Sequence, residues 1–152
     1  MNVVIKENQF NISNVYYTEP IQNIVMDNSK FIKLIYSTEN VMISGLCLLL
    51  QLKVSNKELY FKKLKFIYDI KTNKEILNKI YDIESIILNK IGNQKKQRKI
   101  LYETLSSGII KLFPNNENES NNNNSNNSFI LKISGIWEND TEYGLTYKIL
   151  YI

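Results

Sequence analysis

The fold is decided by the C-terminal stretch of the chain, residues 129–152, which reads FILKISGIWENDTEYGLTYKILYI. Every second residue from 131 to 137 and from 143 to 151 is aliphatic, aromatic or glycine. Alternation with period two, rich in β-branched and aromatic residues, predicts two strands that each bury one face. The polar residues ENDT at 138–141 supply a turn between them. We therefore expect an antiparallel hairpin that contributes heavily to the core.

Three more strands are predicted upstream of this hairpin. Residues 30–37 alternate in the same way, and STEN at 37–40 forms a hairpin turn. Residues 41–53 are almost wholly apolar, which indicates a strand that is buried on both sides or curls from one sheet to another. Gly45 in this stretch marks a bulge or a sharp bend. Residues 59–68 are predicted to form the third strand, after a turn at 54–58.

The period then changes from two to that of a helix. Five isoleucines recur at intervals of three or four residues between positions 76 and 91, which predicts an amphipathic helix over 73–91. Thr72 and Glu75 match a capping box at its start, and Gly92 suits its end. A shorter second helix is expected within 97–107, followed by a short strand at 109–113.

Taken in order, the elements predict a mainly β protein with helices. A three-stranded meander, the helix at 73–91 with a short second helix, and a C-terminal hairpin give the layout of an OB-like β-barrel. The alternative is an α+β sheet with helices on one face. The OB-like domain is expected to span 30–152, with 1–29 as an N-terminal extension packed on it. Residues 115–128 are almost purely Asn, Ser and Glu, so we expect a disordered insertion there.

Composition restricts the classes of function. The chain has 19 Lys and Arg against 15 Asp and Glu, and the net charge of +4 permits an anionic partner but also suits an ordinary surface. It has no histidine and one cysteine, Cys47, in an apolar run, which excludes zinc sites and indicates a buried, inert thiol. Without a glycine-rich phosphate loop or a nucleophile motif, we expect neither an enzyme nor a cofactor.

The acids Glu138, Asp140 and Glu142 lie close together in the sequence, so a metal-dependent hydrolase is a third and weaker hypothesis. Solvated acids at a turn are the simpler interpretation. No apolar run reaches the length of about 18 residues that a membrane span needs. The start of the chain does not resemble a signal peptide, so we expect an intracellular protein and no membrane partner.

Lysines and aromatic residues mix on the strand faces that should point away from the core. Single-stranded nucleic acid needs such a surface, with ammonium groups along the phosphates and aromatic rings under the bases. A cluster at 95–99 adds a candidate phosphate contact, although it also suits a solvated loop between helices. The residues predicted to bind nucleic acid are Phe31, Lys33, Phe61, Lys63, Lys65, Lys95, Lys96, Arg98, Lys99, Lys132 and Lys148. The alternative is that these lysines merely solvate outward faces.

Two segments carry a resemblance to a known family. The stretches SKFIKLIYSTENVMISGL (29–46) and ISGIWENDTEYGLTYKI (133–149) resemble small OB-fold-like proteins of nucleocytoplasmic large DNA viruses of the mimivirus type. The Asn-rich insertion and the excess of lysine over arginine are similar to the coding of such giant viruses. The resemblance implies a relationship to viral single-stranded DNA-binding proteins. It also implies a place in the host cytoplasm, in a viral factory, or in the virion.

These observations lead to two functional hypotheses. The first is a non-catalytic protein that binds single-stranded DNA or RNA in viral DNA replication or genome handling. The second is a structural or assembly protein of a virus particle or complex, which acts through contacts with further copies of itself or with other viral proteins.

Overall fold

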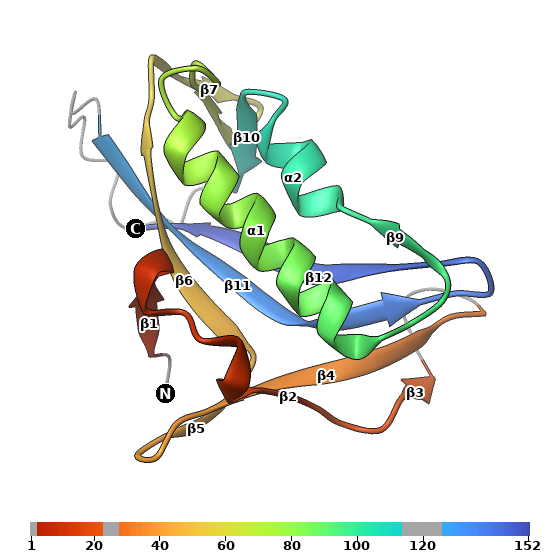
Figure 1. Ribbon diagram of the computed structural model, residues 1–152. Helices are drawn as coiled ribbons and strands as arrows, with labels where there is room; N and C mark the ends of the chain where they lie inside the picture. Colours follow the sequence, from red (N-terminus) through yellow and green to blue (C-terminus); the bar gives the residue numbers. More distant parts are fainter. Residues whose placement is uncertain (1–2, 23–27, 114–125) are drawn as a thin grey trace.

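The computed structural model describes residues 3–22, 28–113 and 126–152 (Figure 1). Its central strand is β11 (Asn126–Glu138), which pairs antiparallel with β12 (Glu142–Tyr151) and so confirms the predicted C-terminal hairpin. β11 begins at Asn126, inside the stretch predicted to be disordered, and the rest of that stretch, 115–125, lies outside the described residues. On its other edge β11 pairs first with β6 (Leu46–Lys53) and then with β4 (Lys30–Ser37).

A glycine allows β11 to change partner in this way. The register of β11 shifts between Ile133 and Gly135, where a bulge separates the part paired with β6 from the part paired with β4. A Cβ atom on Gly135 would lie 2.2 Å from the carbonyl oxygen of Ile32 and 2.7 Å from the ring of Phe31. No real Cβ can approach a backbone oxygen so closely, so only glycine lets β4 dock at this point.

The apolar stretch at 41–53 bends, as predicted, at Gly45. Its first part, β5 (Met42–Ser44), pairs with β4, and its second part, β6, pairs with β11. Gly45 has a φ of +82°, and its N–H donates to the carbonyl oxygen of Leu34 at 2.8 Å. Glycine adopts a left-handed backbone conformation without the steric cost that other residues meet, so Gly45 allows the chain to bend and to pair with two different strands.

The described part of the N-terminal segment supplies edge strands. β1 (Val4–Lys6) pairs parallel with β6, while β2 (Val15–Tyr17) and β3 (Ile21–Gln22) pair antiparallel with β4. Short 3-10 turns at Glu7–Gln9 and Ile12–Asn14 connect β1 to β2. The segment expected to pack on the domain is therefore hydrogen-bonded into its large sheet.

A second sheet of three antiparallel strands has the order β10-β8-β7. It consists of β7 (Asn56–Tyr60), β8 (Lys63–Ile67) and β10 (Ile109–Leu112). The prediction of one strand over 59–68 is wrong, because the chain turns back at Phe61 and Lys62. The ring of Phe66 lies 5.0 Å from that of Phe129 and 4.9 Å from that of Tyr151, measured between centroids, and so joins the small sheet to the large one.

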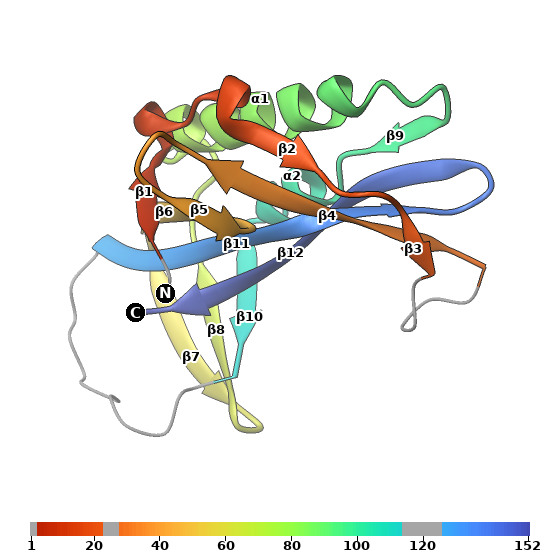
Figure 2. The ribbon, with the colours of Figure 1, turned by 90° about the horizontal axis from the view of Figure 1, so that it is seen from below.

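The long helix α1 (Lys74–Ile91) is confirmed, and it ends at Gly92 in a left-handed conformation. Its buried side chains pack into the same core as the large sheet, and the helix lies along one face of that sheet (Figures 1 and 2). The predicted capping box is wrong: the N-cap is Asn73, whose side chain binds Lys53 and Asp69 instead. The start of α1 is thereby tied to the end of β6.

The predicted second helix is shorter than expected, because α2 covers only Ile100–Leu105. Lys96–Arg98 form β9, which pairs parallel with β12 at the edge of the large sheet. The N-terminus of α2 is held by Glu84 of α1, a fully buried residue whose carboxylate accepts the N–H groups of Leu101 and Tyr102 at 3.1 and 3.0 Å. Burial raises the pKa of Glu84, and these two backbone hydrogen bonds oppose the rise.

The described residues are therefore mainly β with two α-helices, as predicted. Its sheets are open: the main strand order β1-β6-β11-β12-β9 has free ends, and the described strands do not show the closure of an OB-like barrel. The three-stranded meander is also wrong, because β6 pairs with β11 rather than with the strand that follows it. With α1 along one face of the sheet, the arrangement matches the α+β alternative more closely.

Candidate functional site

Three of the predicted residues, Phe61, Lys63 and Lys65, lie together on the small sheet. Lys63 and Lys65 alternate along β8 with the buried Leu64 and Phe66, so their side chains point away from the core. Lys65 pairs directly with Lys111 of β10. Three rings, those of Tyr60, Phe61 and Phe113, complete the surface. We call the residues Tyr60, Phe61, Lys63, Lys65, Lys111 and Phe113 the basic–aromatic face.

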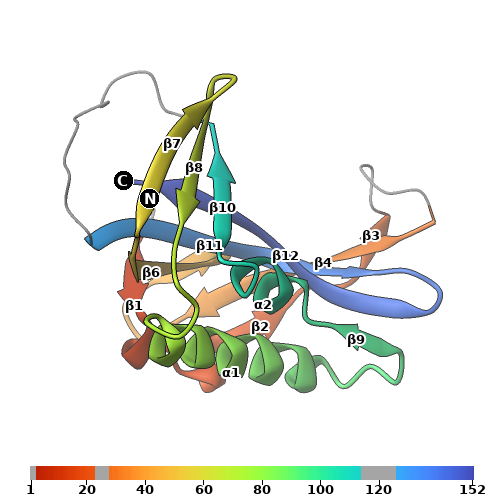
Figure 3. The same ribbon diagram turned by 90° about the horizontal axis from the view of Figure 1, so that it is seen from above.

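The rings of the basic–aromatic face are open to solvent. Tyr60, Phe61 and Phe113 are 64, 80 and 74% exposed. The centroids of Tyr60 and Phe61 lie 4.3 Å apart in an edge-to-face arrangement, and the Nζ atom of Lys63 lies 5.1 Å from the ring centroid of Phe113. Figure 3 shows that the small sheet projects from the large one, with the β7–β8 turn at its far end. Rings and cations are thus presented together at a protruding edge.

The turn that carries Phe61 is conformationally costly. Phe61 and Lys62 have φ angles of 45° and 63°, in the left-handed region that turns of this kind normally fill with Asn or Gly. A bulky residue there costs about 1–2 kcal/mol. Backbone strain of this kind is concentrated at functional sites in proteins. An exposed phenylalanine at a strained turn gains no burial that would offset the cost, which marks the tip as a candidate contact point.

Charge is concentrated on the same sheet. Residues 56–67 and 109–112 carry five lysines and a single glutamate, a surplus that equals the net charge of +4 of the whole chain. Lys63 and Lys111 are exposed, Lys65 is half-buried, and Glu58 lies opposite Lys65 on β7. On the outward face of this sheet, Lys63, Lys65 and Lys111 stand against Glu58, so the face is basic although the protein as a whole is only mildly so.

A second group of predicted residues lies on the large sheet. Lys132 of β11 pairs directly with Lys148 of β12, and like charges in this position repel each other. Phe31 and Lys33 alternate on β4 with buried residues, so all four side chains lie on the face that points away from the core. Phe31 is half-buried and covers Gly135. The predicted strand residues are thus divided between two sheets rather than gathered on one wall.

Cys47 lies opposite Lys132 on β6 and is buried, as predicted. Burial raises the pKa of its thiol, although the nearby Lys132 opposes the rise. A thiol with a raised pKa holds little thiolate, so Cys47 is a poor nucleophile.

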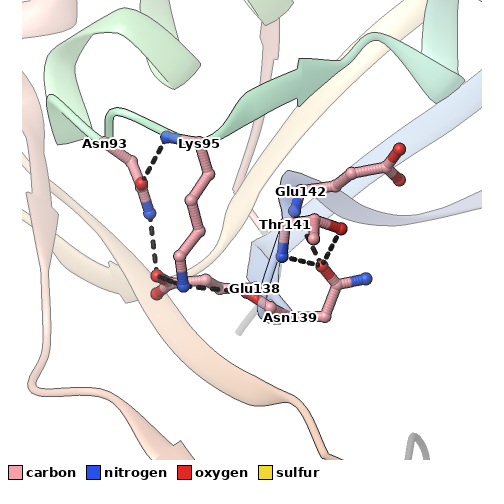
Figure 4. Close-up of polar contacts among 6 residues, drawn as sticks. All are labelled: Asn93, Lys95, Glu138, Asn139, Thr141 and Glu142. Atoms are coloured by element: carbon pink, nitrogen blue, oxygen red, sulfur yellow. Dashed lines mark hydrogen bonds and ion pairs between the residues drawn. The ribbon is translucent and has the colours of Figure 1, made fainter.

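Two cations of the predicted basic cluster are engaged in ion pairs within the chain. The Nζ atom of Lys95 lies 2.6 Å from Oε1 of Glu138 and donates to the carbonyl oxygen of Asn139 at 2.8 Å (Figure 4). Arg98 pairs with Glu142 at 3.2 Å. The hydrogen bond from Lys95 holds the pKa of Glu138 below its usual range. Lys95 and Arg98 therefore order the β11–β12 turn against β9 and would have to exchange partners to bind a phosphate.

The remaining cations of the 95–99 cluster, Lys96 and Lys99, differ in how accessible they are to a ligand. Lys99 donates to the hydroxyl of Tyr81 at 2.7 Å, which lowers the pKa of Tyr81. Lys96 is exposed on β9. Of the four cations predicted at 95–99, Lys96 is thus the most accessible to a ligand.

The acids of the hydrolase hypothesis do not form a common site. Glu138 binds Lys95 and Asn93, and Glu142 binds Arg98. Within the described residues, no group of three or more Asp, Glu, Cys or His side chains is placed to hold a metal ion.

Sequence reasoning missed Tyr60, Lys111 and Phe113 as members of the basic–aromatic face. A single strand over 59–68 would place Tyr60 on the same face as the buried Leu64, whereas the turn at Phe61 and Lys62 pairs Tyr60 with Lys63. Lys111 and Phe113 join through pairing of β10 with β8, more than 40 residues apart in the sequence. The mixture of lysines and rings in 57–65 and 111–113 was the available signal.

Comparison with protein-family models, characterised proteins and solved structures finds no match to this chain. No helix among the described residues is long and apolar enough to cross a membrane.

Proposed function

We propose that the protein binds single-stranded nucleic acid, DNA or RNA, without catalysing a reaction, and that the basic–aromatic face is its main contact surface. The observation that supports the proposal is the presence of Lys63, Lys65 and Lys111 beside three exposed rings on one small sheet. The ammonium groups would contact phosphates, and the rings would stack on unpaired bases. Each stacked base contributes about 1–3 kcal/mol in proteins of this kind.

Unpaired strands suit this surface better than a duplex does. Stacking on a side chain needs a base face that is not already covered by its neighbours, and in a duplex both faces of each base are stacked. The exposed ring of Phe61 at the tip of the sheet can reach an unpaired base, and no base pairs of a duplex have to be opened first. Contacts between lysines and phosphates do not distinguish one base sequence from another, so the same surface suits DNA and RNA.

The second group consists of Phe31, Lys33, Lys132 and Lys148, together with Lys96, all on the large sheet. In this proposal it is a separate and weaker contact, which a strand bound to the basic–aromatic face does not need. Mutual repulsion between Lys132 and Lys148 would be relieved by a phosphate placed between them. Lys95, Arg98 and Lys99 contribute less, because each already has a partner within the chain. A bound strand would therefore contact the basic–aromatic face first.

The proposal also includes an OB-like relationship of the fold, a role in viral DNA replication or genome handling, and a location in the host cytoplasm or the virion. They rest on the sequence resemblance to proteins of large DNA viruses. The binding surface itself does not depend on barrel closure, since it lies on a separate three-stranded sheet.

The proposal is tested by fluorescence anisotropy with a labelled thymidine oligonucleotide and a duplex of equal length. We expect binding to the single strand at micromolar concentrations or below in low salt, weaker binding to the duplex, and a steep loss of affinity as salt is added. No binding to the single strand at low salt would contradict the proposal.

One observation favours the alternative function, a structural or assembly protein. Leu59 on the small sheet and Met42 on the large one are 62 and 75% exposed, and an aliphatic side chain of this kind can contact an apolar surface of a protein partner. Size-exclusion chromatography with light scattering separates the two functions. Large species in the absence of nucleic acid, reduced by Leu59→Ser or Met42→Ser, would support assembly, whether with copies of this chain or with other viral proteins.

A further inference from the structure

The basic–aromatic face is limited in extent. Lys57 belongs to the same small sheet but lies on its opposite face, with its Nζ atom 4.9 Å from the ring centroid of Tyr151. Lys95 and Arg98 are ion-paired, and Lys132 and Lys148 lie on the large sheet. The accessible cations on this face are therefore Lys63, Lys65 and Lys111, with Lys62 at the turn.

The sheet register fixes the spacing of these cations. Lys65 and Lys111 are cross-strand neighbours, whose Cβ atoms lie about 5 Å apart in antiparallel sheets. Lys63 is two residues further along β8, a rise of about 7 Å. Each of the three lysines can contact one phosphate, so this cluster suits about three consecutive phosphates of an unpaired strand.

The rings on this face provide two stacking positions rather than a continuous platform. Tyr60 meets Phe61 edge-to-face, so it supports Phe61 and does not offer a parallel surface beside it. Phe113 lies under Lys63, which places a cation next to the second ring. Phe61, at the β7–β8 turn, and Phe113, beside Lys63, are thus separate positions, and each can receive one base.

We infer that the ligand of this surface is a short unpaired segment of about three to four nucleotides, with two stacked bases, such as an overhang or a small loop. A long strand wrapped around the domain would need a continuous path of free cations, whereas Lys95 and Arg98 are ion-paired within the chain and Lys132 and Lys148 lie on the other sheet. This inference rests on the proposed function, because it specifies the ligand class of the same site.

The test measures affinity for thymidine oligonucleotides of two to twelve nucleotides by competition against a labelled strand. Each affinity is divided by the number of registers in which the oligonucleotide can occupy the site, because longer strands gain affinity from register number alone. We expect the corrected affinity to rise up to about four nucleotides and then stay constant within about twofold. A hairpin with an overhang of four nucleotides should bind as well as the free strand of that length.

Variants assign the two stacking positions. Phe61→Ala and Phe113→Ala should each weaken binding by about tenfold, and Tyr16→Ala, which removes an exposed ring from β2, should leave the affinity within about twofold. A corrected affinity that keeps rising beyond about eight nucleotides would overturn the short footprint while the proposed function stands. Equal losses from Phe61→Ala and Tyr16→Ala would overturn the assignment of the stacking position. Failure to bind at every length would overturn the proposed function itself.

Discussion

The side chain of Asn73 joins the end of β6 to the start of α1, and its removal gives the sharpest prediction about the fold. Asn73 is only 4% exposed. Its Oδ1 atom accepts the N–H of Lys53 at 2.8 Å, and its Nδ2 atom donates to the carbonyl oxygens of Lys53 and Asp69 at 3.0 and 2.9 Å. One amide thus satisfies three backbone groups at the junction of sheet and helix.

The expected loss of stability follows from these three bonds. A hydrogen bond contributes about 0.5–1.5 kcal/mol net, and a buried backbone group left without a partner costs more. Asn73→Ala should therefore lower the free energy of unfolding by about 3 kcal/mol. Asn73→Asp keeps the acceptor for Lys53 but turns a carboxylate oxygen toward two carbonyl oxygens, so it should destabilise at least as much at neutral pH.

Urea unfolding followed by circular dichroism measures both effects, with Asn78→Ala on the exposed side of α1 as the control. Repulsion from carbonyl oxygens raises the folded-state pKa of an aspartate at position 73. Stability of Asn73→Asp should therefore be greatest at low pH and fall as pH rises, relative to Asn73→Ala. A loss below about 0.5 kcal/mol for Asn73→Ala, or no pH dependence for Asn73→Asp, would refute the reasoning.

Three further predictions concern single contacts. Burial raises the pKa of Glu84. The wild-type protein should therefore lose stability relative to Glu84→Gln as pH rises above the ordinary glutamate pKa of 4.5, which urea unfolding at pH 5 and pH 8 measures. A gain in the stability of the wild-type protein relative to the variant would contradict this assignment. Gly135→Ala should lower the free energy of unfolding by about 2–3 kcal/mol, because the new Cβ would lie 2.2 Å from the carbonyl oxygen of Ile32; a neutral effect in thermal unfolding would show that β4 does not dock there. The side chains of the ion pair Lys95–Glu138 are 34 and 16% exposed. A double-mutant cycle of Lys95→Met and Glu138→Gln should give a coupling energy of about 1 kcal/mol. Zero coupling energy would mean that Lys95 is free to bind a ligand.

Local patterns in the sequence were sufficient for the elements that depend on neighbouring residues. Alternation predicted β4 and the β11–β12 hairpin, isoleucine spacing predicted α1, and Gly45 marked the bend between β5 and β6. Each of these depends on side-chain period or on backbone freedom within a few residues. Such information is fully present in the sequence.

The pairing of strands and the limits of the site depend on distant residues and were not predictable in the same way. The stretch around Phe61 and Lys62 contains no Gly, Asn, Asp or Pro, so nothing marked the turn that splits the expected third strand. Lys111 joins the basic–aromatic face only because β10 pairs with β8. Lys95 in a basic cluster looks free in the sequence, while its partner Glu138 is 43 residues away.

The most direct test of the proposed binding surface is the salt dependence of affinity in a triple variant, Lys63→Gln, Lys65→Gln and Lys111→Gln. The matched control, Lys6→Gln, Lys71→Gln and Lys74→Gln, removes the same charge from exposed lysines elsewhere. Each phosphate contact of a single strand contributes about −0.7 to the slope of log affinity against log salt. The triple variant should therefore flatten the slope by about 2 and the control should leave it unchanged. Equal slopes for the two variants would contradict a binding surface on the small sheet.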